Sequence, residues 1–176
     1  MKLIESDPIL AEICRLVEGR LQHVGCLATI EIPAVLLEHF TNLGHPVTPK
    51  DPTAYNRSEH KIFVNAEVFP SFSVEAGQFA LAHEIGHHAH YVGIAASLPE
   101  FRSVHPCLIA DWLAVKWGFA EEMRMERLAD RGPEFCEKLS TISSEEELHQ
   151  WATDWEPRFR NARRRGQNIA PPKLRF

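Results

Sequence analysis

The residues with the clearest chemical meaning in this sequence are the histidines and the glutamate of His83-Glu84-Ile85-Gly86-His87. On a helix of about 3.6 residues per turn, His83 and His87 lie one turn apart on one face, so both imidazoles can bind one metal ion. Glu84 is offset by one residue, so its carboxylate can lie beside a metal-bound water and act as a general base. The spacing predicts a Zn²⁺ site that activates water for hydrolysis, with Glu84 as the catalytic residue.

A third protein ligand is expected from outside this helix, because catalytic zinc usually takes three protein ligands and leaves a fourth position for water. The strongest candidates are Cys107 and Asp111. They are four residues apart, so they share one face of the next predicted helix. A shared metal site would explain two metal-binding side chains on an otherwise apolar helix.

The helix that must carry the two histidines is predicted over residues 74–92, which no proline interrupts. Gly86 lies inside it, where glycine costs roughly 1 kcal/mol relative to alanine, so we expect another element to pack closely there. Further helices are predicted over 8–25, 34–43, 106–118, 120–130, 133–139 and 144–164, strands over 26–33 and 61–65, and a loop over 45–57. Residues 34–43 could instead continue the preceding strand. The expected fold class is α+β, a single mainly helical domain with a small sheet.

Three segments together resemble the ImmA/IrrE family of zinc metallopeptidases. They are Ile62-Phe-Val-Asn65, Gly77-Gln-Phe-Ala-Leu-Ala-His83-Glu-Ile-Gly-His87 and Ala110-Asp111-Trp-Leu-Ala114. The resemblance covers residues 61–118 and implies a zincin-like active-site helix and a cytosolic peptidase whose substrates are regulatory proteins such as transcriptional repressors. In the wider gluzincin group the following helix carries Glu-x-x-x-Asp, in which the Glu binds zinc and the Asp braces a zinc-bound histidine.

This chain departs from that pattern because Cys107 stands where the Glu is expected. Carried over residue by residue, the resemblance implies His83, His87 and Cys107 as ligands, Glu84 as the base and Asp111 as the brace. Two other arrangements stay open: Asp111 ligates while Cys107 packs as a small apolar residue, or the site no longer holds metal well. A thiolate donates more charge to zinc than a carboxylate does, so we expect the departure to affect the catalytic rate more than metal binding.

Hydrolysis also needs a donor that stabilises the transition state, and Tyr55, Tyr91, His88 and His105 are the candidates. The strand Ile62–Asn65 could serve as an edge that pairs with an extended peptide substrate. The alternative function is a non-proteolytic zinc-containing regulatory or partner-binding protein. A toxin or effector that acts on a host protein is a third possibility.

The charge of the chain is unevenly distributed. Its net charge is -5, yet residues 157–176 contain seven Arg or Lys residues and no acid. The preceding residues 1–156 therefore carry 12 basic and 24 acidic residues. We predict a metallopeptidase domain over 1–156 and a basic tail over 157–176. The tail either folds back on the acidic body or contacts nucleic acid or an acidic partner.

The cysteines and the lengths of the apolar segments indicate the cellular compartment. Cys14, Cys26, Cys107 and Cys136 are scattered and form no Cys-x-x-Cys pair, so reduced thiols are expected. No apolar run approaches the roughly 20 residues that cross a bilayer, and the N-terminus lacks the apolar core of a signal peptide. We therefore expect a cytoplasmic protein without membrane contact.

Overall fold

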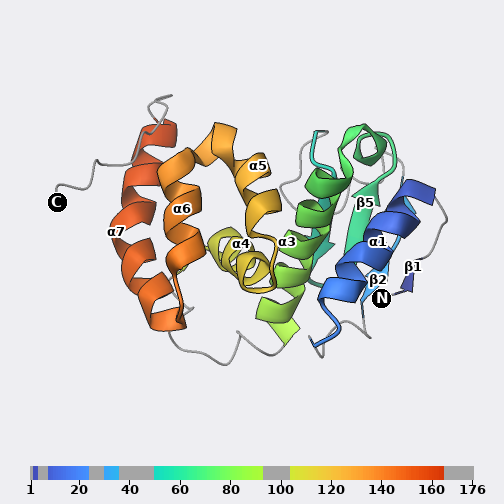
Figure 1. The fold of residues 1–176 in the computed structure, drawn as a ribbon, viewed down its shortest axis with the longest axis horizontal. Coiled ribbons are helices and arrows are strands. Elements are labelled where there is room, and N and C mark those ends of the chain that lie inside the picture. The colour runs from blue at the N-terminus through green and yellow to red at the C-terminus, as the bar shows by residue number, and fades with distance from the viewer. Residues whose placement is uncertain (1, 4–7, 24–29, 36–49, 93–103, 165–176) are drawn as a thin grey trace.

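The structure is a computed structural model that describes residues 2–3, 8–23, 30–35, 50–92 and 104–164, and it shows a mainly helical α+β fold (Figure 1). The strands are β1 (Lys2–Leu3), β2 (Glu31–Ile32), β3 (Ala34–Val35), β4 (Thr53–Asn56) and β5 (Lys61–Asn65). The helices are α1 (Pro8–Arg20), α3 (Val74–Val92), α4 (Pro106–Lys116), α5 (Ala120–Arg131), α6 (Pro133–Thr141) and α7 (Glu145–Arg164), with a short 3-10 helix η2 (Phe69–Ser71).

Helix α3 lies at the centre of the molecule. Figure 1 shows the sheet and α1 on one side of it and the helices α4 to α7 on the other. Helix α3 packs against α1, β4, α4 and α5, and side chains on all its faces are buried, among them Phe79, Leu81 and Ile85. A helix that is apolar on several faces is stable only when it is covered on all of them. The site-bearing helix is therefore fixed from both sides.

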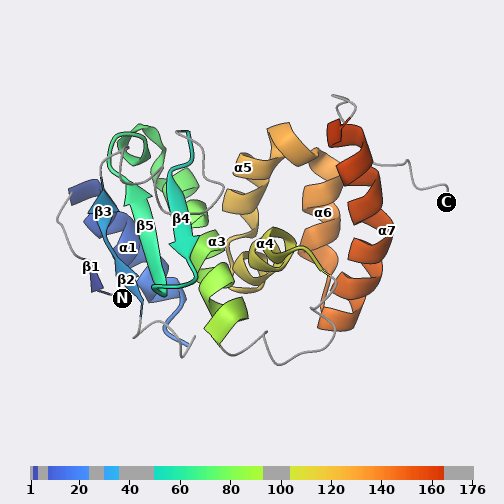
Figure 2. The ribbon, with the colours of Figure 1, turned by 180° about the vertical axis from the view of Figure 1, so that it is seen from behind.

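The sheet is built around β5. On one edge of β5, β2 and β3 run parallel to it in a single register, with Glu31 opposite Lys61 and Ala34 opposite Val64. They are two halves of one strand separated at Pro33, whose carbonyl accepts the Val64 N–H at 3.0 Å. Strand β4 pairs with the other edge of β5 and is antiparallel to it (Figure 2). This arrangement places β4 next to α3.

Two of the expected elements are wrong. The helix predicted over 34–43 is wrong at its start, because Ala34–Val35 continues the strand pairing with β5 beyond Pro33; residues 36–43 lie outside the described part of the chain. The loop predicted over 45–57 is wrong at its end, where Thr53–Asn56 forms β4. The reason is the turn that follows: the Asn56 side-chain oxygen accepts the N–H groups of Ser58 and Glu59 at 3.0 and 3.1 Å, which closes a hairpin onto β5.

The edge strand also differs from the expectation. We expected Ile62–Asn65 to offer a free edge to a substrate, but β4 covers one edge of β5 and β2 and β3 cover the other. Within the described residues, the strand that has no neighbouring strand on its second side next to α3 is β4.

The remaining expectations on described residues are confirmed, with small shifts of boundary. The strand over 61–65 and the helix over 74–92 have the predicted limits, and the first helix ends at Arg20 rather than near Gly25. Helix α7 runs without a break across positions 156 and 157, so residues 157–164 of the predicted tail are helical; residues 165–176 lie outside the described chain. In the part of the chain that is described, no helix combines the length and the apolar character needed to cross a membrane.

The close packing expected at Gly86 is confirmed. A Cβ placed on Gly86 would lie 2.8 Å from the Ala110 Cα and 2.9 Å from the Ala110 carbonyl oxygen. These are backbone atoms of α4, which cannot move aside without moving the whole helix. The missing side chain thus lets α3 and α4 approach closely, and α4 carries Cys107 and Asp111.

Replacing Gly86 by alanine is expected to destabilise the fold by about 1–3 kcal/mol, the usual cost of overpacking, even though alanine gains about 1 kcal/mol in helix propensity. Gly77→Ala on the same helix is the matched control. Its added Cβ would meet the tip of Ile13 at 2.7 Å and the Phe69 ring at 3.1 Å, which are side-chain atoms that can rotate away. Denaturant unfolding of both variants measures the difference. Equal stabilities would contradict the tight contact between the helices.

Candidate metal centre

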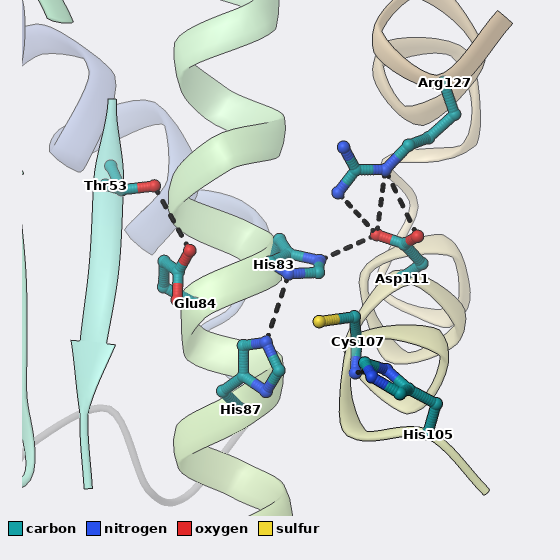
Figure 3. A network of polar contacts seen from close by, with 8 residues as sticks. All are labelled: Thr53, His83, Glu84, His87, His105, Cys107, Asp111 and Arg127. Carbon is teal, nitrogen blue, oxygen red and sulfur yellow. Dashed lines mark hydrogen bonds and ion pairs between the residues drawn. The ribbon is translucent and has the colours of Figure 1, made fainter. Parts of the chain in front are cut away.

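Three side chains converge between α3 and α4 as metal ligands would. The Nε2 atoms of His83 and His87 are 3.1 Å apart, and their rings are perpendicular with centroids at 4.7 Å. Cys107 completes the group, since one ligand atom from each of the three residues lies within 4.8 Å of the other two. Figure 3 shows the Cys107 sulfur pointing from α4 toward the two histidines. His83, His87 and Cys107, called the triad below, form a cluster that could hold a metal ion.

The donor set of the triad fits zinc. Two imidazoles bound at about 2.0–2.1 Å in tetrahedral geometry bring their nitrogens to roughly 3.3 Å from one another, close to the observed spacing. Thiolate and imidazole ligands suit a borderline-soft ion such as Zn²⁺, whereas Mg²⁺ and Ca²⁺ prefer oxygen. Three protein ligands leave one position of a tetrahedral site open.

Asp111 lies outside the triad, on the far side of His83. Its Oδ1 is 2.7 Å from the His83 Nδ1, the ring nitrogen that does not face His87. It is 1% exposed, so its charge needs partners. Arg127 on α5 supplies them: the Arg127 Nε donates to Oδ1 and Oδ2 at 3.3 and 3.2 Å, and Nη2 donates to Oδ1 at 3.1 Å. Asp111 thus holds the His83 ring in one orientation and is not part of the triad.

The charges of these groups are coupled in the metal-free protein. Burial opposes charge on His83, but the charge of Asp111, its hydrogen bond and a contact with Cys107 outweigh burial and raise the pKa of His83 to about 10. Burial would also raise the pKa of the Cys107 thiol, yet contacts with three imidazoles, those of His105, His83 and His87, lower it to about 3. The pKa of Asp111 is held well below its usual range, because Arg127 and His83 outweigh the effect of burial.

Glu84 faces β4. Its Oε2 accepts the backbone N–H of Tyr55 at 2.8 Å, and its Oε1 accepts the Thr53 hydroxyl at 3.4 Å. Figure 3 shows the carboxylate between α3 and β4, one residue along the helix from His83. Both donors come from the strand that the sequence analysis read as loop, so this contact was not foreseen. The two bonds hold the carboxylate in one orientation at the edge of the site.

The triad and Glu84 open onto one cleft of about 770 Å³. Strand β4 lines one wall, α3 forms the base, and α4 with α5 lines the other wall. The lining residues include Tyr55, Phe79, Tyr91, Cys107 and Arg127. A cleft of this size can admit several residues of an extended peptide or a small ligand.

The four side chains proposed as hydrogen-bond donors to the transition state lie at different positions relative to the cleft. Tyr55 and Tyr91 line the cleft, and the Tyr91 ring stacks on His87 with centroids 6.4 Å apart. The Tyr55 hydroxyl is already paired with the His60 Nδ1 at 2.9 Å. His88 is buried, and the Nδ1 of His105 accepts the Cys107 backbone N–H at 3.2 Å as the cap of α4. The two tyrosines are therefore better placed than the two histidines to reach a bound molecule.

Arg127 is the residue beside the triad that the sequence did not single out. A buried Asp111 signals that a cation must be near, but α5 contains three arginines and spacing alone does not select one. The structure selects Arg127, which contacts Asp111 and also lies 5.0 Å from the Phe79 ring centroid on the wall of the cleft.

Replacing Arg127 by methionine is expected to weaken zinc binding by about 10- to 100-fold, the usual effect of losing a residue that orients a ligand. The metal-free fold should lose about 3–5 kcal/mol, because Asp111 keeps a buried charge without its cation. Chelator competition and denaturant unfolding measure the two effects. Arg124→Met is the control, since Arg124 is exposed and its contact with Glu121 is 3.8 Å long, so it should change stability by less than about 1 kcal/mol. Equal effects of both substitutions would contradict the role of Arg127.

Comparisons of the chain with protein-family models, with proteins of curated function and with solved structures find no significant match. What the site does must therefore be argued from its own residues and geometry.

Proposed function

We propose that this protein is a cytosolic zinc metallopeptidase of the ImmA/IrrE type, which hydrolyses a peptide bond in a protein or peptide substrate. The proposed targets are regulatory proteins such as repressors. One observation carries the proposal: His83, His87 and Cys107 converge on one point of a cleft that Glu84 also lines. A structural zinc site is normally closed by four protein ligands, whereas a catalytic site keeps a position open. Within the described residues, the cluster has three.

Zinc bound to the triad would supply Lewis-acid chemistry, polarising a substrate carbonyl and making a water molecule more acidic. The chain's own residues have the other tasks. His83, His87 and Cys107 would hold the metal through two imidazole nitrogens and a thiolate sulfur, and Asp111 keeps the His83 ring in place.

Glu84 is the proposed general base. Its carboxylate is held by the Tyr55 N–H and the Thr53 hydroxyl at the edge of the cleft, where it can take a proton from water and pass it to the leaving amine. Tyr91 is the proposed donor to the developing oxyanion, since its ring lies on the cleft wall against His87.

Strand β4 is the proposed support for the substrate backbone. It forms one wall of the cleft and, within the described residues, has no strand on its second side. An extended peptide can add to such an edge through backbone hydrogen bonds. The Tyr55 N–H is engaged by Glu84, so the peptide would pair with other backbone groups of this edge.

A second candidate function is a zinc-containing regulatory or partner-binding protein without peptidase activity, with a toxin or effector as a further variant. The replacement of the expected Glu by Cys107 favours it, because a thiolate makes the metal a weaker Lewis acid. Contact of the basic tail, residues 157–176, with nucleic acid or an acidic partner belongs to this candidate and stays a prediction.

Glu84→Gln separates the two candidates. We expect the zinc-loaded protein to cleave members of a proteome-derived peptide library and the variant to lose that cleavage by at least about 100-fold, since it retains the shape but not the base. Mass spectrometry of new peptide N-termini measures cleavage, and metal analysis checks that both proteins hold zinc. If the wild-type protein holds zinc and cleaves nothing, the regulatory candidate is favoured.

A further inference from the structure

Cys107 is the metal-binding residue that is chemically different from its neighbours. Imidazoles resist mild oxidants, whereas a thiolate sulfur reacts with peroxides by a two-electron oxidation. Cys107 is partly exposed and lines the cleft, so a small molecule in the cleft can reach it. The other two described cysteines, Cys14 and Cys136, are buried in the core and do not line the cleft.

The position of the sulfur makes its oxidation consequential for the metal. Cys107 is one of only three ligands in the described cluster, and its ligand atom lies within 4.8 Å of those of His83 and His87. Losing it would leave two imidazoles from one helix turn, which is a weak site for zinc. Helix α4 would then have no metal bond to α3, although the contact at Gly86 keeps the helices together.

From these observations we propose that Cys107 is a modification site, at which a hydroperoxide oxidises the metal-binding thiolate to a sulfenic acid and thereby releases the metal. This inference rests on the proposed zinc site. The sulfur attacks one peroxide oxygen and the O–O bond breaks. The second oxygen leaves as hydroxide and takes a proton to become water, or an alcohol if the peroxide is organic. The sulfur is oxidised by two electrons and the peroxide is reduced by two.

The surroundings of Cys107 also determine how the modification would be reversed. Among the described residues no second cysteine lines the cleft, so none is placed there to form a disulfide with the sulfenic acid. A small thiol that enters the cleft from solution can reduce the sulfenic acid, and further peroxide would carry the sulfur to the irreversible sulfinic acid. Oxidation and reduction of Cys107 would thus make zinc occupancy, and with it any activity of the site, depend on the concentrations of peroxide and thiol.

The experiment uses the full-length zinc-loaded chain and hydrogen peroxide, with a chromogenic chelator to follow released zinc and a dione probe to trap sulfenic acid. We expect release of about one zinc ion per chain, together with one adduct that peptide mapping places on Cys107. A small thiol followed by fresh zinc should restore the metal. Cys14→Ser should behave as the wild type, and Cys107→Glu, with an oxidation-resistant carboxylate ligand, should keep its zinc in peroxide.

The outcomes distinguish this inference from the proposed function. Zinc that stays bound in peroxide, or an adduct that maps to another cysteine while zinc is released, overturns the inference and leaves the zinc site intact. A folded chain that never takes up zinc overturns the proposed function itself. Peptide mapping of the sulfenic-acid adduct in the wild-type protein tests the inference even if Cys107→Glu does not fold.

Discussion

Zinc is expected to bind at about one ion per chain in the wild-type protein and to be lost from His83→Ala. A site with four ligands binds zinc with an apparent free energy of about 10–16 kcal/mol, or about 2.5–4 kcal/mol per ligand. Removing one of three ligands should therefore weaken binding by roughly 100- to 1,000-fold. The buried pair between Asp111 and Arg127 remains in this variant, so the charge behind the ring stays compensated. Metal analysis after gel filtration, with chelator competition, measures the loss.

His90→Ala is the matched control for this substitution. His90 lies on the same helix and is partly buried, but it is not part of the triad. We expect it to keep its zinc, and circular dichroism should show that all three proteins are folded. The metal site would be refuted by a wild-type protein that is folded and free of zinc even after incubation with the metal. Equal losses in both variants would mean that the helix, not the ligand, controls binding.

The local parts of the site could be predicted from sequence because they depend on helix geometry alone. His83 and His87 share a face by their spacing of four residues, and the same spacing puts Cys107 and Asp111 together on the next helix. Gly86 was informative for a related reason. A glycine inside a helix is costly, so a close neighbour was expected, and Ala110 is that neighbour.

The parts that sequence could not predict depend on contacts between distant segments. Cys107 and Asp111 are both competent ligands, and only the packing of α4 on α3 decides that the sulfur faces the two histidines while the carboxylate lies behind one of them. Thr53 was missed because the short strand β4 has no pattern of its own and is stabilised by pairing with β5. Secondary structure that depends on a partner strand leaves a weak signal in its own residues.

The sequence also left open a site that no longer holds metal well. The contacts of Asp111 with His83 and Arg127 bear on this alternative. Asp111 is buried, and Arg127 on a third helix donates hydrogen bonds to its carboxylate from both Nε and Nη2. These contacts keep the His83 ring in an orientation that suits a metal ligand, which is compatible with the proposed site, and the zinc measurement above decides between a site that binds metal and one that has lost it.

The affinity for zinc is expected to rise about tenfold for each unit of pH between about pH 7 and pH 9. In the metal-free protein the pKa of His83 is raised to about 10, chiefly by the charge and hydrogen bond of Asp111 acting against burial. The imidazole therefore carries a proton throughout this range, and zinc must displace it. One proton per ion corresponds to a tenfold change, or about 1.4 kcal/mol, for each pH unit. Cys107 adds no proton to this count, because the low pKa of its thiol, about 3, leaves it ionised.

Zinc affinity rises with pH in this range because the pKa of His83 is raised and not lowered. A raised pKa extends the range in which protons compete with zinc, so the plateau of affinity moves up to about pH 10, whereas an ordinary histidine would give a plateau above about pH 6.5. Chelator competition across this range measures the slope. Asp111→Asn removes the carboxylate that raises the pKa of His83, so its plateau should begin at a lower pH although its affinity is weaker. A wild-type affinity that does not change between about pH 7 and pH 9 would show that His83 is already neutral, and the Asp111–His83 bond would then act by orientation and not by charge.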